Sequence, residues 1–275
     1  MTDITAADGL QQARQLAADG RLADARQLTA ALCREHAEHA DAWLLLGNLQ
    51  GHLGDFTQAE QCLRRGLSLQ PDNAQGHYQL AAALKAQGRL EEAIRQYQHT
   101  LQLQPDLARA HNDLGVACQE LGRLDRATDC YREAIRRQPG YAMAHYNLAN
   151  LQRDRASLEE ALSGYRTASR LRPDLEDAIA GEAGILMLQG DTEGALHCIR
   201  PLIDRGTGNA FVAAQFAELS RKAGDTDEAL RRARDELDQL SAQLNQEIEN
   251  ADPGNRDNQQ PTRSRDAPSD DKGQQ

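Results

Sequence analysis

Three neighbouring side chains, His111, Asn112 and Asp113, are of the types that enzymes use for acid–base chemistry. An imidazole exchanges protons near neutral pH, and an adjacent amide or carboxylate could orient it. The same imidazole recurs at His77 and His145, each 34 residues from His111. A single active site does not recur at a fixed interval, whereas a repeat architecture does. We therefore interpret the triplet as part of a repeated structural unit and not as a catalytic centre.

Other side chains with metal-binding or nucleophilic chemistry are also explained by helix packing. Packed helices lie on the order of 10 Å apart, whereas zinc needs ligands at about 2 Å, so histidines in successive repeats cannot share an ion. Cys118 lies seven residues after His111 on the same predicted helix. This separation is roughly 10.5 Å along the helix axis, which is too far for a thiol–imidazole pair. Cys33, His36 and His39 have helical spacing but no fourth ligand. No phosphate-binding loop, Ser–His–Asp arrangement or dinucleotide fingerprint occurs, so we expect no metal, no cofactor and no enzyme activity.

The composition restricts the classes of partner. The 275 residues include 42 acidic and 31 basic side chains, for a net charge of −11, and so we expect no binding of nucleic acid. No apolar run approaches the roughly 20 residues of a membrane span, and the first residues do not have the pattern of a signal peptide. The five cysteines are odd in number and form no C-x-x-C pair, which is typical of reduced thiols. We expect a cytoplasmic protein.

A 34-residue repeat carries the residues discussed above. One segment of it reads GRLADA at Gly20, GDFTQA at Gly54, GRLEEA at Gly88, GRLDRA at Gly122, ASLEEA at Ala156, GDTEGA at Gly190 and GDTDEA at Gly224. A small residue recurs upstream, at Ala13, Gly47, Ala81, Gly115, Ala149, Ala183 and Ala217. Four copies close with Pro71, Pro105, Pro139 and Pro173. Seven copies therefore align without a single insertion or deletion.

Each column of the repeat has a physical role in a pair of helices. The glycine supplies a left-handed turn after the first helix, and the acidic residues that follow it suit the start of the second helix. The small residues allow the two helices to approach closely. The space between them is filled by Leu46, Leu80, Leu114 and Leu148 from first helices and by Leu63, Tyr97, Tyr131 and Tyr165 from second helices.

This pattern resembles the tetratricopeptide repeat over about Ala6 to Leu240. The resemblance implies an all-α fold, an α-solenoid of about seven helix-turn-helix repeats in a right-handed superhelix with a concave groove. We expect an N-terminal extension at 1–5 and a solenoid over 6–250, followed by a disordered tail at 251–275. The repeats are expected to start near residues 6, 40, 74, 108, 142, 176 and 210.

The C-terminal part departs from the regular pattern. Pro201 falls inside the predicted second helix of the sixth repeat, so we expect a break or kink near Arg200. Leu230, Leu237, Leu240, Leu244 and Ile248 then form one apolar stripe on a longer helix. We interpret this helix as a cap over the end of the solenoid and expect a monomer. A dimer formed through this helix is the alternative.

Two functions fit the sequence. The first is a non-catalytic scaffold that binds a peptide or a partner protein, of unknown identity, in its concave groove. The second is an accessory arm of a glycosyltransferase or sulfotransferase system, because the repeats also resemble the repeat arms of those bacterial enzymes. That alternative requires a catalytic domain on another chain, since none is recognisable in this sequence.

The resemblance places the groove on the first helix of each pair. It implies a peptide-binding surface made of Tyr78, Lys85, Arg109, Asn112, Tyr146, Asn147, Asn150 and Arg153. Asparagine both donates and accepts hydrogen bonds and could therefore pair with a peptide backbone, and tyrosine is enriched at binding hot spots. The cationic residues of this set favour a partner with acidic residues. For any single member, a merely solvated helix face is an equal alternative.

Overall fold

The protein is described by a computed structural model that covers residues 6–206, 210–223, 235 and 237–243. Helices are the only regular secondary structure within these ranges, so the predicted all-α class is confirmed. The first helices of the successive pairs are α1 (Ala6–Ala18), α3 (Ala40–His52), α5 (Ala74–Ala86), α7 (Ala108–Glu120), α9 (Ala142–Asp154), α11 (Glu176–Leu188) and α13 (Ala210–Ala223). The second helices are α2 (Leu22–Glu35), α4 (Phe56–Leu69), α6 (Leu90–Leu103), α8 (Leu124–Arg137), α10 (Leu158–Leu171) and α12 (Thr192–Asp204).

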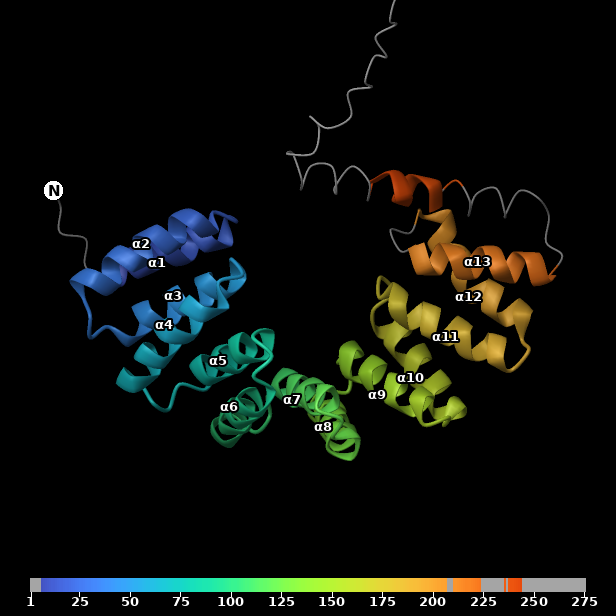
Figure 1. Cartoon of the computed structure of the whole chain (residues 1–275), viewed down its shortest axis with the longest axis horizontal. Helices are drawn as coiled ribbons and strands as arrows, with labels where there is room; N and C mark the ends of the chain where they lie inside the picture. Colours follow the sequence, from blue (N-terminus) through green and yellow to red (C-terminus); the bar gives the residue numbers. More distant parts are fainter. Residues whose placement is uncertain (1–5, 207–209, 224–234, 236, 244–275) are drawn as a thin grey trace, which may run out of the picture. The chain divides into compact units, whose positions relative to one another are not determined.

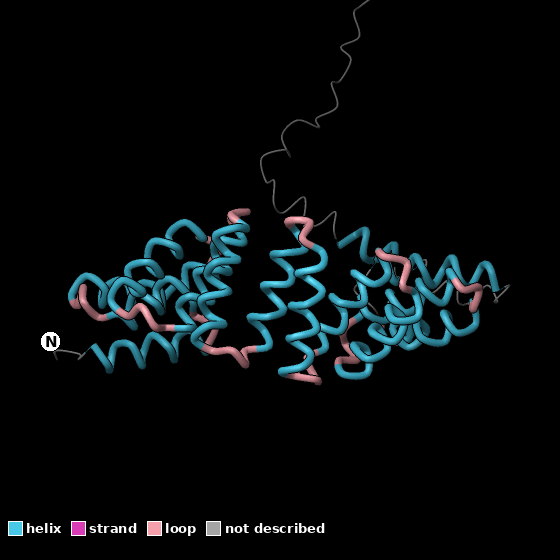
Figure 2. Tube along the Cα trace, turned by 90° about the horizontal axis from the view of Figure 1, so that it is seen from below, coloured by secondary structure: helices cyan, strands magenta, loops and turns pink. Residues whose placement is uncertain are grey.

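The described part of the chain forms two compact units, the first ending at Cys198 and the second beginning at Ile199. In the first unit each helix packs most closely on the other member of its pair and then on the next pair along the chain (Figure 1). Short loops connect these helices, as the trace in Figure 2 shows. The first unit is therefore an α-solenoid built from contacts between neighbours, as the 34-residue repeat predicts.

Small residues and tyrosines form the core between the paired helices. Among the described residues, the alanines that close the repeated segment, such as Ala59, Ala93 and Ala127, are 0% exposed. Tyr131 and Tyr165 are likewise 0% exposed. A β-carbon placed on Gly115 of α7 would lie 2.6 Å from Cε1 of Tyr131 on α8, so this ring needs glycine opposite it. The small column thus makes room for the large side chain of the same pair.

The turn inside each pair uses a left-handed residue. Five glycines at this position, Gly20, Gly54, Gly88, Gly122 and Gly190, have φ between 71° and 83°. The fifth pair instead places Ala156 there, with φ of 59°. Left-handed backbone is unfavourable for a residue with a β-carbon, so the turn at Ala156 stores strain.

We expect the change Ala156→Gly to raise the free energy of unfolding by about 0.5–1 kcal/mol. Relief of the left-handed strain contributes roughly 1–2 kcal/mol, and the greater freedom of glycine in the unfolded chain offsets part of it. Urea denaturation followed by circular dichroism measures the difference. The reciprocal change Gly122→Ala is the matched control and should lower the stability. A lower midpoint for Ala156→Gly would show that the turn is not strained.

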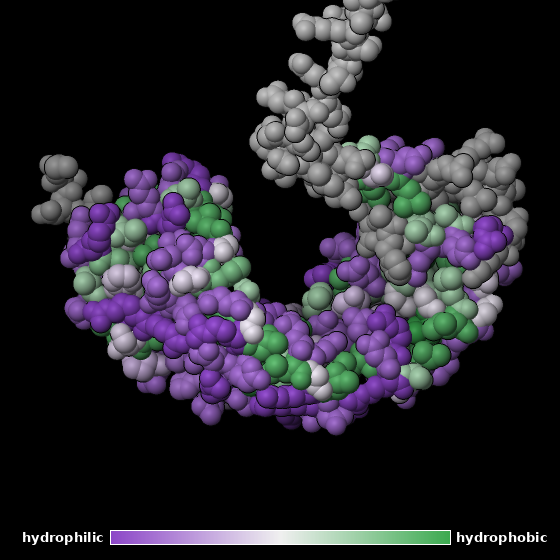
Figure 3. Space-filling view, in the orientation of Figure 1, coloured by the Kyte–Doolittle hydropathy of each residue, from purple (hydrophilic) through white to green (hydrophobic). Residues whose placement is uncertain are grey.

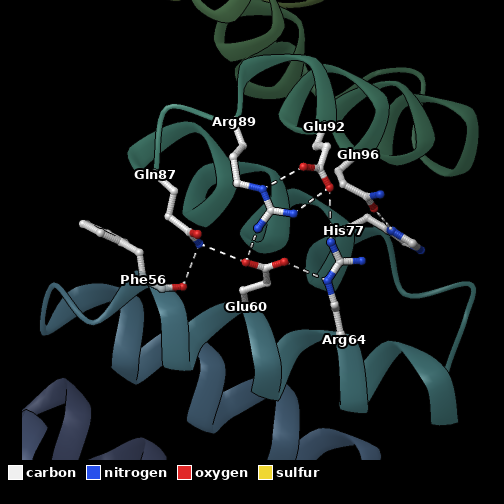
Figure 4. A network of polar contacts seen from close by, with 8 residues as sticks. All are labelled: Phe56, Glu60, Arg64, His77, Gln87, Arg89, Glu92 and Gln96. Carbon is white, nitrogen blue, oxygen red and sulfur yellow. Dashed lines mark hydrogen bonds and ion pairs between the residues drawn. The ribbon is translucent and has the colours of Figure 1, made fainter.

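A polar network ties the second helix pair to the third on the side of the second helices (Figure 4). Glu60 of α4 accepts hydrogen bonds from Arg64 (2.9 Å), from Arg89 (2.6 Å) and from Gln87 (3.1 Å). Arg89 also pairs with Glu92 at 2.7 Å. Burial of the Glu60 carboxylate opposes its ionisation, yet these donors hold its pKa below the ordinary value. The network therefore joins α4 to the turn before α6 and to α6 itself.

Of the predicted break or kink near Arg200, the break is wrong, because α12 continues through Pro201 to Asp204, while the kink stays a prediction. Ile199, Leu202 and Ile203 are at most 6% exposed, so the helix keeps an apolar face on both sides of the proline. Burial of this face offsets the hydrogen bond that proline cannot donate. The buried residues of the second unit also include Val212 and Phe216 of α13.

Residues 237–243 are helical. The rest of the predicted capping helix and the predicted tail at 251–275 lie outside the described residues. None of the helices in the described ranges has both the length and the apolar character that crossing a lipid bilayer requires.

Candidate functional site

The histidine of the triplet, His111, closes the loop that precedes its own helix α7. Its Nε2 atom lies 2.9 Å from the carbonyl oxygen of Pro105. The same contact joins His77 to Pro71 at 2.7 Å and His145 to Pro139 at 2.9 Å. The repeat pattern predicts a packing role for this column but not the hydrogen bond. The signal for it is a proline six residues before each of the three histidines.

The amide of the triplet, Asn112, links two neighbouring first helices. Only 4% of Asn112 is exposed. Its side-chain oxygen accepts a hydrogen bond of 2.9 Å from Nδ2 of Asn147 on α9, and its own Nδ2 donates to Asp113 at 3.1 Å. Asn112 is thus used inside the stack, where it joins α7 to α9, and little of it is open to a partner.

Asp113, the carboxylate of the triplet, contacts the preceding first helix α5, whereas Asn112 contacts the following first helix α9. It accepts a hydrogen bond from the hydroxyl of Tyr78 on α5. Burial raises the pKa of Tyr78, and the charge of Asp113 raises it further, so the phenol remains a hydrogen-bond donor. The guanidinium of Arg109 lies over the Tyr78 ring, 4.3 Å from its centroid. An aromatic ring held by Asp113 therefore positions an exposed cation by a cation–π contact.

The predicted residues of α9 form a second group, which contacts α10. The ring centroids of Tyr146 and Tyr165 are 6.0 Å apart, and the Tyr165 hydroxyl donates to Asn150 at 2.6 Å. Arg153 lies beside its neighbour Asp154, with a nitrogen–oxygen distance of 3.1 Å. Lys85, on α5, is half-buried and forms no ion pair with any residue that the structure describes.

The structure thus divides the eight predicted residues. Tyr78, Arg109, Asn112 and Asn147 belong to one connected cluster with Asp113, which spans α5, α7 and α9. Tyr146, Asn150 and Arg153 belong to the group on α9 and α10, and Lys85 stands apart. Asp113 is not among the eight residues that the sequence predicts for the groove. The signal for Asp113 is an acidic residue in a column that holds the amides Gln79 and Asn147 in the neighbouring repeats.

The cysteines lie at buried or half-buried positions. Cys33 is 2% exposed among Leu10, Leu32 and Ala42, while His36 is exposed at the end of α2. Cys118 is 0% exposed and so offers no accessible nucleophile. Within the described ranges, no group of three or more histidine, cysteine or acidic side chains has the geometry to hold a metal ion.

Much of the surface visible in Figure 3 is hydrophilic over the first unit, and hydrophobic residues reach it in patches between helices. A cleft lies among the first helices of this unit, next to the cluster of Tyr78 and Arg109. It occupies about 540 Å³, and residues of α3, α4 and α5 line it together with Arg109 of α7. Tyr78 and Arg109 thus belong to the cluster and also line the cleft.

Comparison with known proteins gives one consistent result. Models of the tetratricopeptide repeat match residues 40–73, 72–139 and 112–176. A search of curated proteins finds no match to this chain.

Solved structures show the same fold at low sequence identity. A tetratricopeptide repeat protein from Parabacteroides merdae is 16% identical with a TM-score of 0.66, over 90% of this chain and 96% of its own. PilF of Pseudomonas aeruginosa is 22% identical with a TM-score of 0.63, over 79% of this chain and 94% of its own. The protein TTC0263 of Thermus thermophilus is 24% identical with a TM-score of 0.54, over 66% of this chain and 100% of its own.

Proposed function

Because the chain belongs to the tetratricopeptide repeat family, we propose that it is a non-catalytic scaffold that binds a peptide or a partner protein on its first-helix surface. We define the first-helix surface as the side of α5, α7 and α9 that carries the Tyr78–Asp113–Arg109 cluster and the Tyr146 group. Repeat solenoids use extended surfaces of this kind to bind partners. A reduced cytoplasmic setting is part of the proposal and is supported by the five cysteines, all of which are free thiols.

The observation that carries the proposal is the ordering of polar and aromatic groups on this surface before any partner is bound. Arg109 lies on a tyrosine ring that Asp113 holds in place, and Asn147 is held by Asn112. Side chains that are already ordered lose less conformational freedom on binding, so more of their contact energy contributes to affinity. Tyrosine and arginine are also the residue types that dominate binding hot spots.

We expect the double change Tyr146→Ala/Asn147→Ala to weaken capture of the partner by roughly thirtyfold. Truncation of a hot-spot residue typically costs about 2 kcal/mol, which corresponds to that factor. The measurement is affinity capture with the full chain and cross-linking, followed by titration of the captured partner. Far-ultraviolet circular dichroism should be unchanged, although Asn112 loses its partner Asn147.

The matched control is Glu160→Ala/Ser163→Ala, a double change at exposed positions of the second helix α10. It removes two polar side chains from a different helix of the same pair and should leave capture unchanged. If the control weakens capture as much as the change on α9, the binding surface does not lie on the first helices. Failure of the full chain to capture any peptide or protein would contradict the scaffold function itself.

A further inference from the structure

The cleft of about 540 Å³ differs in charge from the rest of the molecule. Its walls come from α3, α4 and α5, with Gly51 and His52 at the end of α3 and Tyr78 on α5, and Arg109 reaches it from α7. None of its lining residues is acidic, although the chain carries 42 acidic side chains against 31 basic ones. This cleft is therefore a site where an acidic protein can accept a negatively charged group.

The cation of the cleft has no carboxylate partner in the described part of the chain. Arg109 is exposed and lies over the Tyr78 ring at 4.3 Å. Asp113 is one helical turn further along α7, yet it accepts hydrogen bonds from Tyr78 and Asn112 instead of pairing with Arg109. Many other arginines of the first unit, such as Arg89 and Arg137, are paired with carboxylates. Arg109 is thus positioned and charged but not neutralised by a protein carboxylate.

Amide side chains continue the cleft toward the first repeat. Asn48, Gln75 and Gln79 line both this cleft and a smaller one of about 270 Å³ that Arg14 and Asp41 also border. These three amides form no hydrogen bond with any group that the structure describes, whereas Asn112 and Asn147 are bonded to each other. A primary amide carries both donors and an acceptor, which is what an extended peptide backbone requires. Because these three amides line both clefts, they join the two clefts into one continuous path.

We propose that this path binds an extended peptide segment and that Arg109 receives an aspartate or glutamate side chain of that segment. The inference rests on the proposed scaffold function and names the chemistry of its partner. The peptide backbone lies along Asn48, Gln75 and Gln79. Its carboxylate forms a charge-assisted hydrogen bond with the guanidinium, a contact roughly twice as strong as a neutral one.

Gly51 offers a way to close the cleft without disturbing the fold. A β-carbon built on Gly51 would meet only the β-carbon of Ala59, at 3.9 Å, which is ordinary contact. The side chain of a Gly51→Leu variant therefore extends into the cleft that Gly51 lines. Helicity and the urea midpoint of the variant show independently that the chain is folded.

The test uses a library of end-blocked random octapeptides selected against the full chain. We expect the selected peptides to be enriched in aspartate or glutamate. For one selected peptide, its Glu→Gln or Asp→Asn form, the variant Arg109→Gln and the variant Gly51→Leu should each weaken binding at least tenfold. Combining the peptide change with Arg109→Gln should cost little more than either alone, because both remove one interaction. Arg132→Gln, which removes an exposed cation of the second helix α8 outside the cleft, should change binding less than twofold.

Three outcomes would overturn the inference. Selected peptides without acidic residues, or peptides that depend on Tyr146 and Asn147 but not on Arg109 and Gly51, would reject the cleft and leave the scaffold function standing. Glutarate that binds as tightly as the peptides would show a small-anion site. The absence of any selected peptide, together with failed partner capture, would reject both proposals.

Discussion

Replacing Tyr131 by alanine is expected to lower the free energy of unfolding by about 3–5 kcal/mol, the usual cost of removing a large aromatic side chain from a core. Tyr131 is 0% exposed and belongs to the largest apolar cluster described in the first unit. Its ring fills the space that Gly115 leaves on the paired helix. Alanine at this position would leave a cavity that the surrounding helices can only partly close.

The change Tyr131→Phe is the matched control, because it keeps the ring and removes only the hydroxyl. That hydroxyl donates to Gln119 at 2.8 Å, and a hydrogen bond of this kind contributes about 1 kcal/mol. Urea denaturation followed by circular dichroism should therefore rank the three proteins as wild type, Tyr131→Phe and Tyr131→Ala. Equal midpoints for the two variants would mean that the ring contributes nothing beyond its hydroxyl.

The loss of stability in the Tyr131→Ala variant should be confined to the helices around the substituted residue. In a solenoid each pair contacts only its neighbours, so stability is approximately a sum of local and nearest-neighbour terms. Hydrogen exchange should accelerate first in α7 and α8 of the alanine variant. Amides of α1 and α2, which belong to the first helix pair and not to a neighbour of this one, should keep their protection.

The fold of the first unit could be predicted because each column of the repeat has a physical cause that acts within one pair. Gly54 and Gly88 are left-handed, and Ala59 and Ala93 are buried, in agreement with the roles that the sequence indicates. The path of α12 through Pro201 could not be predicted in this way. It depends on how completely Ile199, Leu202 and Ile203 are buried, and no local pattern reports that.

The candidate site was less predictable, because its contacts join residues of different repeats. The column of Tyr78, Asn112 and Tyr146 contacts the adjacent column of the following repeat, because Tyr78 binds Asp113 and Asn112 binds Asn147. Adjacent residues of a helix differ by about 100° in direction, so each member of a triplet faces a different neighbour. Which neighbour it reaches depends on the offset between successive pairs, and the spacing in the sequence does not contain that offset.

The variant Gly47→Leu is expected to lower the free energy of unfolding by about 3 kcal/mol, at the upper end of the cost of overpacking a core. A β-carbon at Gly47 would lie 2.5 Å from Cγ of Leu63 and 3.0 Å from the backbone oxygen of Ala59, both on α4. Leu63 is 1% exposed and could move only by disturbing its own neighbours. The backbone oxygen cannot move at all unless α4 shifts away from α3.

The same substitution four residues later on α3 should have the opposite effect. A β-carbon on Gly51 would make only an ordinary contact of 3.9 Å with the β-carbon of Ala59, and leucine is a better helix former than glycine, so Gly51→Leu should raise the stability by about 1 kcal/mol. Urea denaturation of the two variants compares the same glycine-to-leucine substitution at two positions of one helix. A Gly47→Leu protein as stable as Gly51→Leu would show that α3 and α4 do not need a glycine between them, and the small column of the repeat would lose its proposed role.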